Sequence, residues 1–184
     1  PILHDAAHSF GSFYKGKPIG NQHEYTIFSF DPVKSITSID GGIIVLDNLK
    51  VPDLHAKRLI GMTQPASRMY KNSRAWKYDV KDLGYRYHMA NIHASIGIAQ
   101  LKKINQIRSK RQSICKTYSE KLQDVKNIIA PKTDFSQVMP FLYYIRIKNG
   151  KREQLREFLS NKNIDTGIHW QPGHHFSYFK DCRY

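Results

Sequence analysis

The sequence predicts an α/β protein in two parts, and three observations predict it. Short apolar runs separated by turn residues fill residues 1–46, as is typical of β-strands. Residues 91–125 lack proline and repeat apolar side chains at helical spacing. A break at Ala130-Pro131 is then followed by a strand pattern, a helix pattern and another strand pattern. The first part is therefore strand-rich, and a smaller α/β unit follows the long helical stretch.

Three strands are predicted before residue 47. The first is a short buried strand that ends at Asp5, which places this acid at the carboxyl end of the strand. Residues 25–30 alternate aromatic and small polar side chains and predict the second strand. After a polar loop over residues 31–40, the glycine pair 41–42 opens a third, apolar strand over residues 43–46.

Helices dominate the middle of the chain. Pro52-Asp53 precedes a helical pattern that extends to about Met62. The polar and aromatic stretch that follows contains Pro65 and Gly84 and predicts a surface excursion to Tyr87. Residues 91–125 predict one long helix, or two helices with a bend.

The last part of the chain predicts a strand over residues 141–147, a helix over residues 152–159 and a strand over residues 165–170. The cysteines Cys115 and Cys182 lack the spacing of a zinc ribbon or a redox motif. The pair His174-His175 has no carboxylate or cysteine at ligand spacing, so we assign no metal site.

Charge allows an anionic partner but does not identify it. The 184 residues include 29 Lys and Arg against 15 Asp and Glu, a formal net charge of +14. A nucleic-acid-binding protein is one interpretation, supported by this charge and by 11 tyrosines, but the basic residues are spread along the chain without an accompanying motif. No apolar stretch approaches the length of a membrane span, and there is no leader-like segment, so a cytoplasmic protein without a membrane partner is expected.

Four motifs follow one another along the chain. They are residues 5–11 (DAAHSFG) with Tyr14-Lys15-Gly16, residues 28–34 (FSFDPVK) with Ile36-Thr37 and Gly41-Gly42, residues 84–89 (GYRYHM) with Ile96-Gly97 and Gln100-Leu101, and residues 167–170 (GIHW) with Pro172. In order and spacing they resemble the sugar-nucleotide aminotransferases of the DegT family, which use pyridoxal 5'-phosphate (PLP).

The resemblance implies the PLP-dependent transferase fold type I. Residues 1–105 would be the C-terminal part of the large PLP-binding domain with the start of a linking helix, and residues 106–184 the rest of that helix and a small α/β domain. It also implies a homodimer with its sites at the interface. The chain would lack the family's first portion, which carries a glycine-rich phosphate-binding turn and an aromatic ring that stacks on the cofactor.

Lys34 matches the family's catalytic, cofactor-bound lysine. The chemistry needs an amine that first holds PLP and then moves a proton between substrate and cofactor. A lysine in water is protonated at neutral pH, so the site must favour the neutral amine, as burial beside other cations would do. Asp5 matches the carboxylate that keeps the cofactor's ring nitrogen protonated, although by itself an acid at a strand end is equally well a solvated or capping group.

The resemblance assigns four further residues. His8 matches the residue that supports the cofactor ring or its acidic partner, where many members have glutamine. Ser29 matches a hydroxyl donor to the cofactor phosphate. Arg86 stands where members commonly have an asparagine that reaches the neighbouring subunit's phosphate, and arginine can bind phosphate in a bidentate manner. His169 matches a substrate-side histidine near the mouth of the site, and packing at a strand end is the alternative.

The implied reaction transfers an amino group from glutamate or glutamine to a nucleotide-linked 3-keto or 4-keto sugar. Related dehydratases have histidine in place of the cofactor lysine, so Lys34 argues against them. A non-catalytic or truncated remnant of the family stays as an alternative, and nucleic-acid binding is the less favoured one.

Overall fold

The computed structural model describes residues 2–46, 51–63 and 78–181. The chain divides into two compact units: Pro1–Glu120 with Lys132–Tyr143, and Lys121–Pro131 with Tyr144–Tyr184. Pro65, near the start of the predicted surface excursion, lies outside the described residues. Cys182 also lies outside them. No helix in the described parts is long and apolar enough to cross a membrane.

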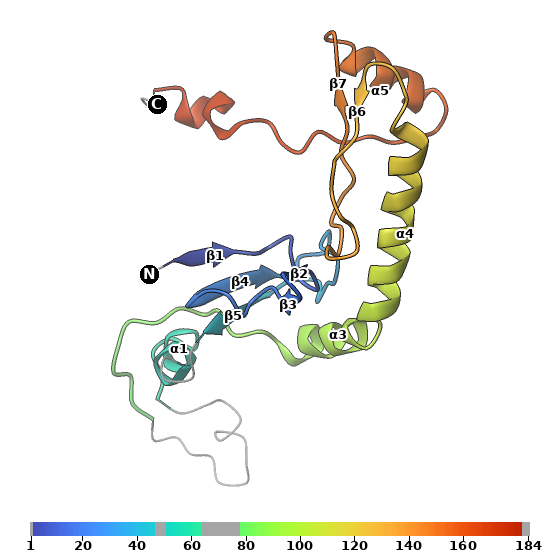
Figure 1. Ribbon diagram of the computed structural model, residues 1–184. Coiled ribbons are helices and arrows are strands. Elements are labelled where there is room, and N and C mark those ends of the chain that lie inside the picture. The colour runs from blue at the N-terminus through green and yellow to red at the C-terminus, as the bar shows by residue number, and fades with distance from the viewer. Residues whose placement is uncertain (1, 47–50, 64–77, 182–184) are drawn as a thin grey trace. The chain divides into compact units, whose positions relative to one another are not determined.

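A three-stranded sheet forms the centre of the first unit (Figure 1). Its order is β1 (Leu3–Asp5), β4 (Tyr25–Ser29) and β5 (Gly42–Leu46). β1 and β4 are parallel, whereas β4 and β5 are antiparallel. All three strands were predicted, and their bounds agree with the prediction to within a residue or two.

Side chains alternate along β4, as a pleated strand requires. Thr26 and Phe28 are buried on one face, and Tyr25, Ile27 and Ser29 are half-buried on the other. Among the described residues of this unit, the other buried apolar side chains are Ala6, Ile36, Cys115 and Met139, which come from four separate stretches of the chain. The core of the first unit therefore joins its sheet, the loop after β4, helix α4 and the returning segment 132–143.

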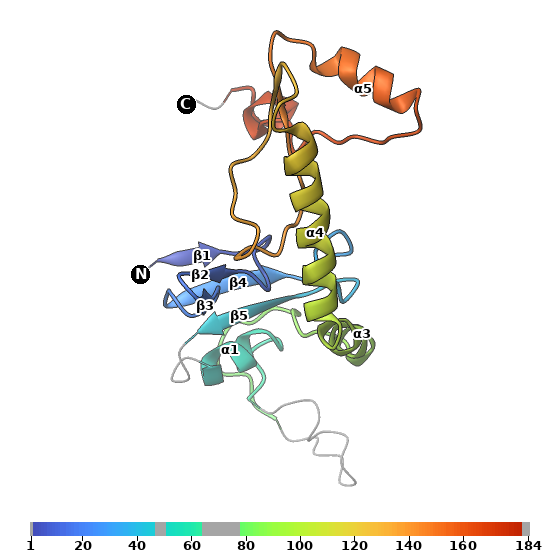
Figure 2. The ribbon, with the colours of Figure 1, turned by 45° about the vertical axis from the view of Figure 1, so that its right-hand side comes forward.

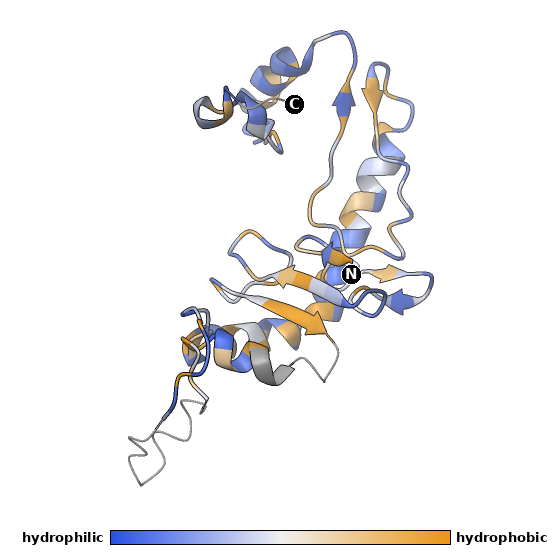
Figure 3. Ribbon diagram, turned by 90° about the vertical axis from the view of Figure 1, so that its left-hand side faces the viewer, coloured by the Kyte–Doolittle hydropathy of each residue, from blue (hydrophilic) through white to orange (hydrophobic). Residues whose placement is uncertain are grey.

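β5 is apolar on both faces, and Figure 3 shows it as hydrophobic along its length. Ile43, Ile44 and Val45 are exposed despite their β-branched aliphatic side chains. Strands with apolar residues at consecutive positions are typical of sheets that are covered on both faces.

A short hairpin that the sequence analysis did not predict lies between β1 and β4. It pairs β2 (Phe13–Tyr14) with β3 (Lys17–Pro18). The two turn residues, Lys15 and Gly16, have φ of 50° and 75°. Positive φ at both positions is what a two-residue hairpin turn of type I′ requires, and Gly16 is the residue that could have marked this turn in the sequence.

Helix α1 (Val51–Lys57) is shorter than predicted. The prediction carried it to about Met62, but the backbone leaves the helical region at Ile60 and Gly61, with φ of 51° and 78°. Met62 instead forms a β-bridge with Val80. The predicted end of the helix was wrong because Leu59 and Met62 form β-bridges with residues 86 and 80 instead of continuing the helix.

The long helical stretch is two helices with a bend, the second of the two predicted forms. They are α3 (Asn91–Leu101) and α4 (Ile104–Leu122), and Figure 2 shows them meeting at an angle. Lys103 N donates to Gln100 O, a tight three-residue spacing at the bend. Neither proline nor glycine occurs there, so the sequence does not mark the exact position of the bend.

The second unit contains β6 (Ile128–Ile129), β7 (Arg146–Ile147), α5 (Arg152–Ser160) and the 3₁₀ turns η2 (Gly173–His175) and η3 (Ser177–Phe179). β6 and β7 are antiparallel. Helix α5 was predicted to within one residue.

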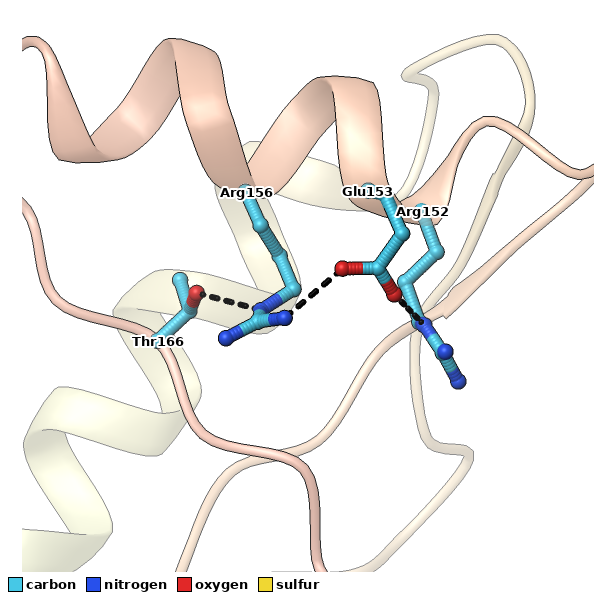
Figure 4. A network of polar contacts seen from close by, with 4 residues as sticks. All are labelled: Arg152, Glu153, Arg156 and Thr166. Atoms are coloured by element: carbon cyan, nitrogen blue, oxygen red, sulfur yellow. Dashed lines mark hydrogen bonds and ion pairs between the residues drawn. The ribbon is translucent and has the colours of Figure 1, made fainter.

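Two strand predictions in the last part of the chain were wrong. Of residues 141–147, only the last two form a strand, because Phe141 belongs to the first unit, where its carbonyl accepts a hydrogen bond from Arg111 instead of pairing with a strand. Residues 165–170 form no strand in the described structure. Arg156 on α5 donates to the Thr166 hydroxyl at 3.3 Å and to Glu153 at 2.7 Å, so a side chain holds this extended segment (Figure 4).

Candidate active site around Lys34

Lys34 lies in the loop that connects β4 to β5. Backbone bonds close the base of this loop: Phe30 N donates to Gly41 O at 2.9 Å, and Ser38 N donates to Phe30 O at 3.0 Å. Inside the loop, Lys34 N donates to Asp31 O at 3.0 Å, which makes a turn just before the lysine side chain. The loop is therefore built by its own backbone, and Lys34 is half-buried.

The residues after Lys34 fix it from the other side. Ile36 is 2% exposed and anchors the loop in the core of the first unit. Between them, the Ser35 hydroxyl oxygen is buried and has no hydrogen-bond partner among the described residues. A buried hydroxyl without a partner is costly, so Ser35, the residue after Lys34, has unused hydrogen-bonding capacity.

The Lys34 amine contacts His8. Lys34 Nζ is 2.9 Å from His8 Nε2. His8 follows β1 by three residues and Lys34 follows β4 by five, so the contact joins the two loops that leave neighbouring parallel strands. The structure thus brings together two of the residues that the sequence analysis proposed for the cofactor site.

Asp5 and Ser29 lie at the ends of those same strands. Asp5 pairs in register with Ile27, two residues before Ser29. Asp5 Oδ1 accepts a hydrogen bond from Ala7 N at 3.0 Å, and Ser29 Oγ accepts one from the next loop at 3.4 Å. The carboxyl ends of parallel strands are the usual place for a ligand in an α/β sheet. Asp5, His8, Ser29 and Lys34 all lie at that edge.

One aromatic residue of this group lies outside all four sequence motifs. Phe141 belongs to the segment 132–143, and its ring stacks on the His8 ring with centroids 4.1 Å apart and an interplanar angle of 15°. Lys34 Nζ lies 5.0 Å from the centroid of the same ring. The sequence pattern predicts Phe141 at the start of a strand, and only the tertiary contacts bring it to Lys34.

Arg86 lies on a different segment of the first unit. It is exposed and forms a β-bridge with Leu59. Backbone bonds hold this pairing on both sides: Tyr85 N donates to Lys57 O at 2.6 Å, and Ile60 N donates to Tyr85 O at 3.0 Å. Among the described residues, no hydrogen bond or ion pair connects Arg86 with Lys34, His8, Asp5 or Ser29, so its phosphate role stays a prediction.

Two glycines allow the segment that carries Arg86 to pack backbone against backbone. A Cβ on Gly84 would collide with the Gly61 nitrogen and would come within 2.8 Å of Lys57 O. We expect Gly84→Ala to destabilise this packing by roughly 1–3 kcal/mol, because neither backbone can move aside as a flexible side chain could. Amide hydrogen exchange at Ile60 and Tyr85 should then become faster.

Gly173→Ala is the matched control, since nothing lies within 4 Å of a Cβ built there. Equal exchange rates at Ile60 and Tyr85 in wild type and Gly84→Ala would contradict the packing argument.

An ion pair reinforces the same segment. Lys57 Nζ lies 3.1 Å from Asp82 Oδ2, and hydrogen bonds from Lys57 and from Leu83 N lower the pKa of Asp82 below its ordinary value. Because the folded-state pKa is lowered, the contact is present above the unfolded pKa and is lost as the pH falls through the folded one. We expect Lys57→Met to raise the pKa of Asp82 toward its ordinary value in a carboxyl NMR titration, and an unchanged midpoint would argue against the pair.

His169 belongs to the second unit. It is exposed, and its ring makes an edge contact with Trp170 at 5.1 Å between centroids. Its role toward a substrate stays a prediction.

The residues at the sheet edge fit PLP, the cofactor that the resemblance implies. Lys34 supplies the amine, Asp5 supplies a carboxylate, and Ser29 and Ser35 supply hydroxyls. The Ser35 hydroxyl has no hydrogen-bond partner among the described residues. His8, in the loop after β1, contacts the amine through Nε2. An amine, a carboxylate and hydroxyls at one strand edge match the carbonyl, ring nitrogen and phosphate of that cofactor.

The comparisons with known proteins agree with this chemistry. The model of the DegT/DnrJ/EryC1/StrS aminotransferase family matches residues 1–184. The UDP-4-amino-4,6-dideoxy-N-acetyl-beta-L-altrosamine transaminase of Campylobacter jejuni is 31% identical over 185 residues, with 98% of this chain and 47% of that protein covered. An uncharacterized protein of Methanocaldococcus jannaschii is 34% identical, with 97% and 48% covered.

Solved structures show the same fold. Spr1654 of Streptococcus pneumoniae, described as a sugar aminotransferase and solved in its PMP form, has a TM-score of 0.87 at 26% identity, with 100% of this chain and 48% of that one covered. PseC of Helicobacter pylori has a TM-score of 0.84 at 23% identity, with 98% and 48% covered. The chain thus spans about half the length of the curated relatives that it matches.

Proposed function

Because the chain belongs to the DegT/DnrJ/EryC1/StrS aminotransferase family, we propose that it carries the cofactor lysine, Lys34, of a PLP-dependent sugar-nucleotide aminotransferase. The reaction moves an amino group from glutamate or glutamine to a nucleotide-linked keto-sugar. The observation that carries the proposal is the contact of Lys34 Nζ with His8 Nε2 at 2.9 Å, at the strand edge where Asp5 also lies.

Lys34 has two tasks in this proposal. Its amine would hold the cofactor, and as a free base it would take a proton from the substrate carbon and return one to the product. When bound, PLP supplies an electron sink. The loop closed by Phe30, Ser38 and Gly41 holds the lysine in one place, which both tasks require.

Asp5 holds the proton on the cofactor's ring nitrogen. A carboxylate that accepts such a proton-bearing nitrogen makes a charge-assisted hydrogen bond, which is stronger than a neutral one. Asp5 Oδ1 already accepts from Ala7 N, which fixes the orientation of the carboxyl group. The short strand β1 positions this acid beside the Lys34 loop through its parallel pairing with β4.

The phosphate is assigned to Ser29 and Arg86. Ser29 ends β4, and its short hydroxyl side chain accepts a hydrogen bond from Asp31 N at the beginning of the Lys34 loop. Arg86 takes the place of the family's asparagine and acts across a homodimer interface in this proposal. A guanidinium binds a phosphate through two parallel hydrogen bonds, so the substitution retains an anion-binding role.

The substrate proposal rests on the relatives and on charge. The Campylobacter jejuni relative is named as a transaminase of a UDP-linked amino sugar. A net charge of +14 favours an anionic substrate such as a nucleotide diphosphate. His169 is assigned to the sugar side of the site, and its exposure in the second unit leaves its ring accessible to a ligand.

Reductive trapping tests the cofactor assignment. The protein is mixed with PLP and reduced with borohydride, and the phosphopyridoxyl group is located by peptide mass spectrometry. Transfer is then followed as 2-oxoglutarate formed from glutamate in the presence of nucleotide-linked keto-sugars. The proposal expects a label at Lys34 and sugar-dependent 2-oxoglutarate. Labels scattered over exposed lysines, without transfer, would favour a non-catalytic member of the family.

A further inference from the structure

We propose that Phe141 is a positioning residue for Lys34, because its ring holds the His8 imidazole with Nε2 facing the lysine amine. This inference deepens the function proposed above and rests on it. Phe141 lies outside all four sequence motifs, in a segment that returns to the first unit after helix α4.

Three contacts connect the three side chains with one another. The His8 and Phe141 rings are nearly parallel, at 15° and 4.1 Å between centroids. Lys34 Nζ lies 2.9 Å from His8 Nε2 and 5.0 Å from the centre of the Phe141 ring. A stacked ring restricts rotation of the imidazole, and the face of an aromatic ring attracts a cation. Phe141 therefore acts on both partners of the Lys34–His8 contact.

Phe141 can orient its neighbours because its own backbone is fixed. Arg111 Nη1 on α4 donates to Phe141 O at 3.2 Å. Two residues earlier, Met139 is 0% exposed, and its amide donates to the buried Ser12 hydroxyl at 2.9 Å. Phe13 N also donates to Gln137 O at 2.7 Å. Hydrogen bonds thus join this segment to both α4 and the hairpin region. They fix the backbone from which the Phe141 ring contacts His8.

The contact sets the protonation pattern of His8. An ammonium group only donates hydrogen bonds, so while Lys34 is charged, His8 Nε2 must be the acceptor and the ring proton must be on Nδ1. If His8 turned around its side-chain bonds, this tautomer would lose its partner. The stacked Phe141 ring opposes tilting of the imidazole out of the stacked plane, so the Nδ1–H tautomer of His8 reports the positioning.

The first test measures that tautomer. Ring nitrogen chemical shifts of ¹⁵N-histidine-labelled protein are recorded for wild type, Phe141→Leu and Phe141→Tyr. We expect His8 to be in the Nδ1–H form in wild type and in Phe141→Tyr, which keeps the ring, and in a mixture of tautomers in Phe141→Leu. If Phe141→Leu does not fold, Phe141→Met serves in its place.

The matched control is Phe135→Leu. Phe135 lies in the same returning segment, but its ring contact is with Tyr143, at 6.0 Å between centroids. Phe135→Leu should leave the His8 tautomer unchanged. A wild-type His8 that is not in the Nδ1–H form, or a Phe135→Leu change as large as that of Phe141→Leu, would overturn the proposal.

The second test uses PLP trapping. The ratio of label at Lys34 to label at exposed lysines should fall about two- to tenfold in Phe141→Leu, the range expected for losing one ring-stacking contact. Phe141→Tyr, which keeps the aromatic ring, should leave the ratio at its wild-type value. An unchanged ratio in Phe141→Leu, with Lys34 still labelled, would reject the role of Phe141 and leave the proposed function intact. Absence of label at Lys34 in wild type would reject the proposed function, while the tautomer test would still judge Phe141.

Discussion

Lys34→Ala is expected to abolish covalent PLP attachment and to reduce amino transfer by at least about 10²–10⁴-fold. The variant removes the nucleophile and also the group that moves the proton, and general acid–base catalysis alone accounts for a factor of that size. Lys34→Arg should lose activity to the same extent: it keeps a charged donor beside His8, but a guanidinium does not lose its proton in proteins. Borohydride trapping and 2-oxoglutarate formation measure the two effects separately.

Lys116→Ala is the control for nonspecific modification. Lys116 lies on α4, its side chain is 76% exposed, and its contact with Glu120 is a long 3.9 Å. Its replacement should change neither the labelled peptide nor the rate of transfer. Full labelling of Lys34→Ala at another lysine, with transfer retained, would contradict the assignment of Lys34.

Phe28→Ala should give the largest loss of stability, about 3–5 kcal/mol in the free energy of unfolding. Phe28 is 3% exposed, and its ring meets the edge of Phe10 at 5.1 Å between centroids. The aromatic side chain also fills the space against Gly20, where even a Cβ would be 3.3 Å from the ring. Removal of the ring leaves a cavity under β4, directly before Ser29, so the Lys34 loop should lose order as well.

Urea denaturation followed by circular dichroism measures this change. Phe158→Ala is the comparison, because Phe158 on α5 is 58% exposed and its truncation should cost no more than about 0.5 kcal/mol. If Phe28→Ala cost less than about 1 kcal/mol, the side chain could not be part of the core described for the first unit.

Local patterns predicted most of the elements of this fold. The strands at Asp5, at residues 25–30 and at residues 43–46 were found because their apolar runs are bounded by polar and glycine residues. The strand over residues 165–170 was predicted by the same kind of pattern and is absent from the described structure. A strand needs a partner as well as a suitable sequence, and Thr166 bonds to Arg156 on α5. Pairing is a tertiary property that a pattern within one segment does not contain.

The candidate site also has residues that local motifs predict and a residue that only tertiary contacts reveal. The motifs around Asp5 and Lys34, and their resemblance to a family, led to Lys34, His8, Asp5 and Ser29, and the structure places all four at one strand edge. Phe141 could not be found in this way, because it is more than a hundred residues from Lys34 and has no motif around it. Its position depends on Met139 and Arg111, whose contacts arise only when the chain folds back from α4.

The division of the chain into two units limits how the protein can be cut. Residues 132–143 belong to the first unit, although residues 121–131 and 144–184 on either side belong to the second. The polypeptide therefore crosses from one unit to the other three times. After a protease has cleaved one of these crossings, the other two still join the two units covalently. A fragment that ends after α4 would lack Met139 and Phe141, and any uninterrupted stretch of the gene that encodes all of one unit also encodes residues of the other.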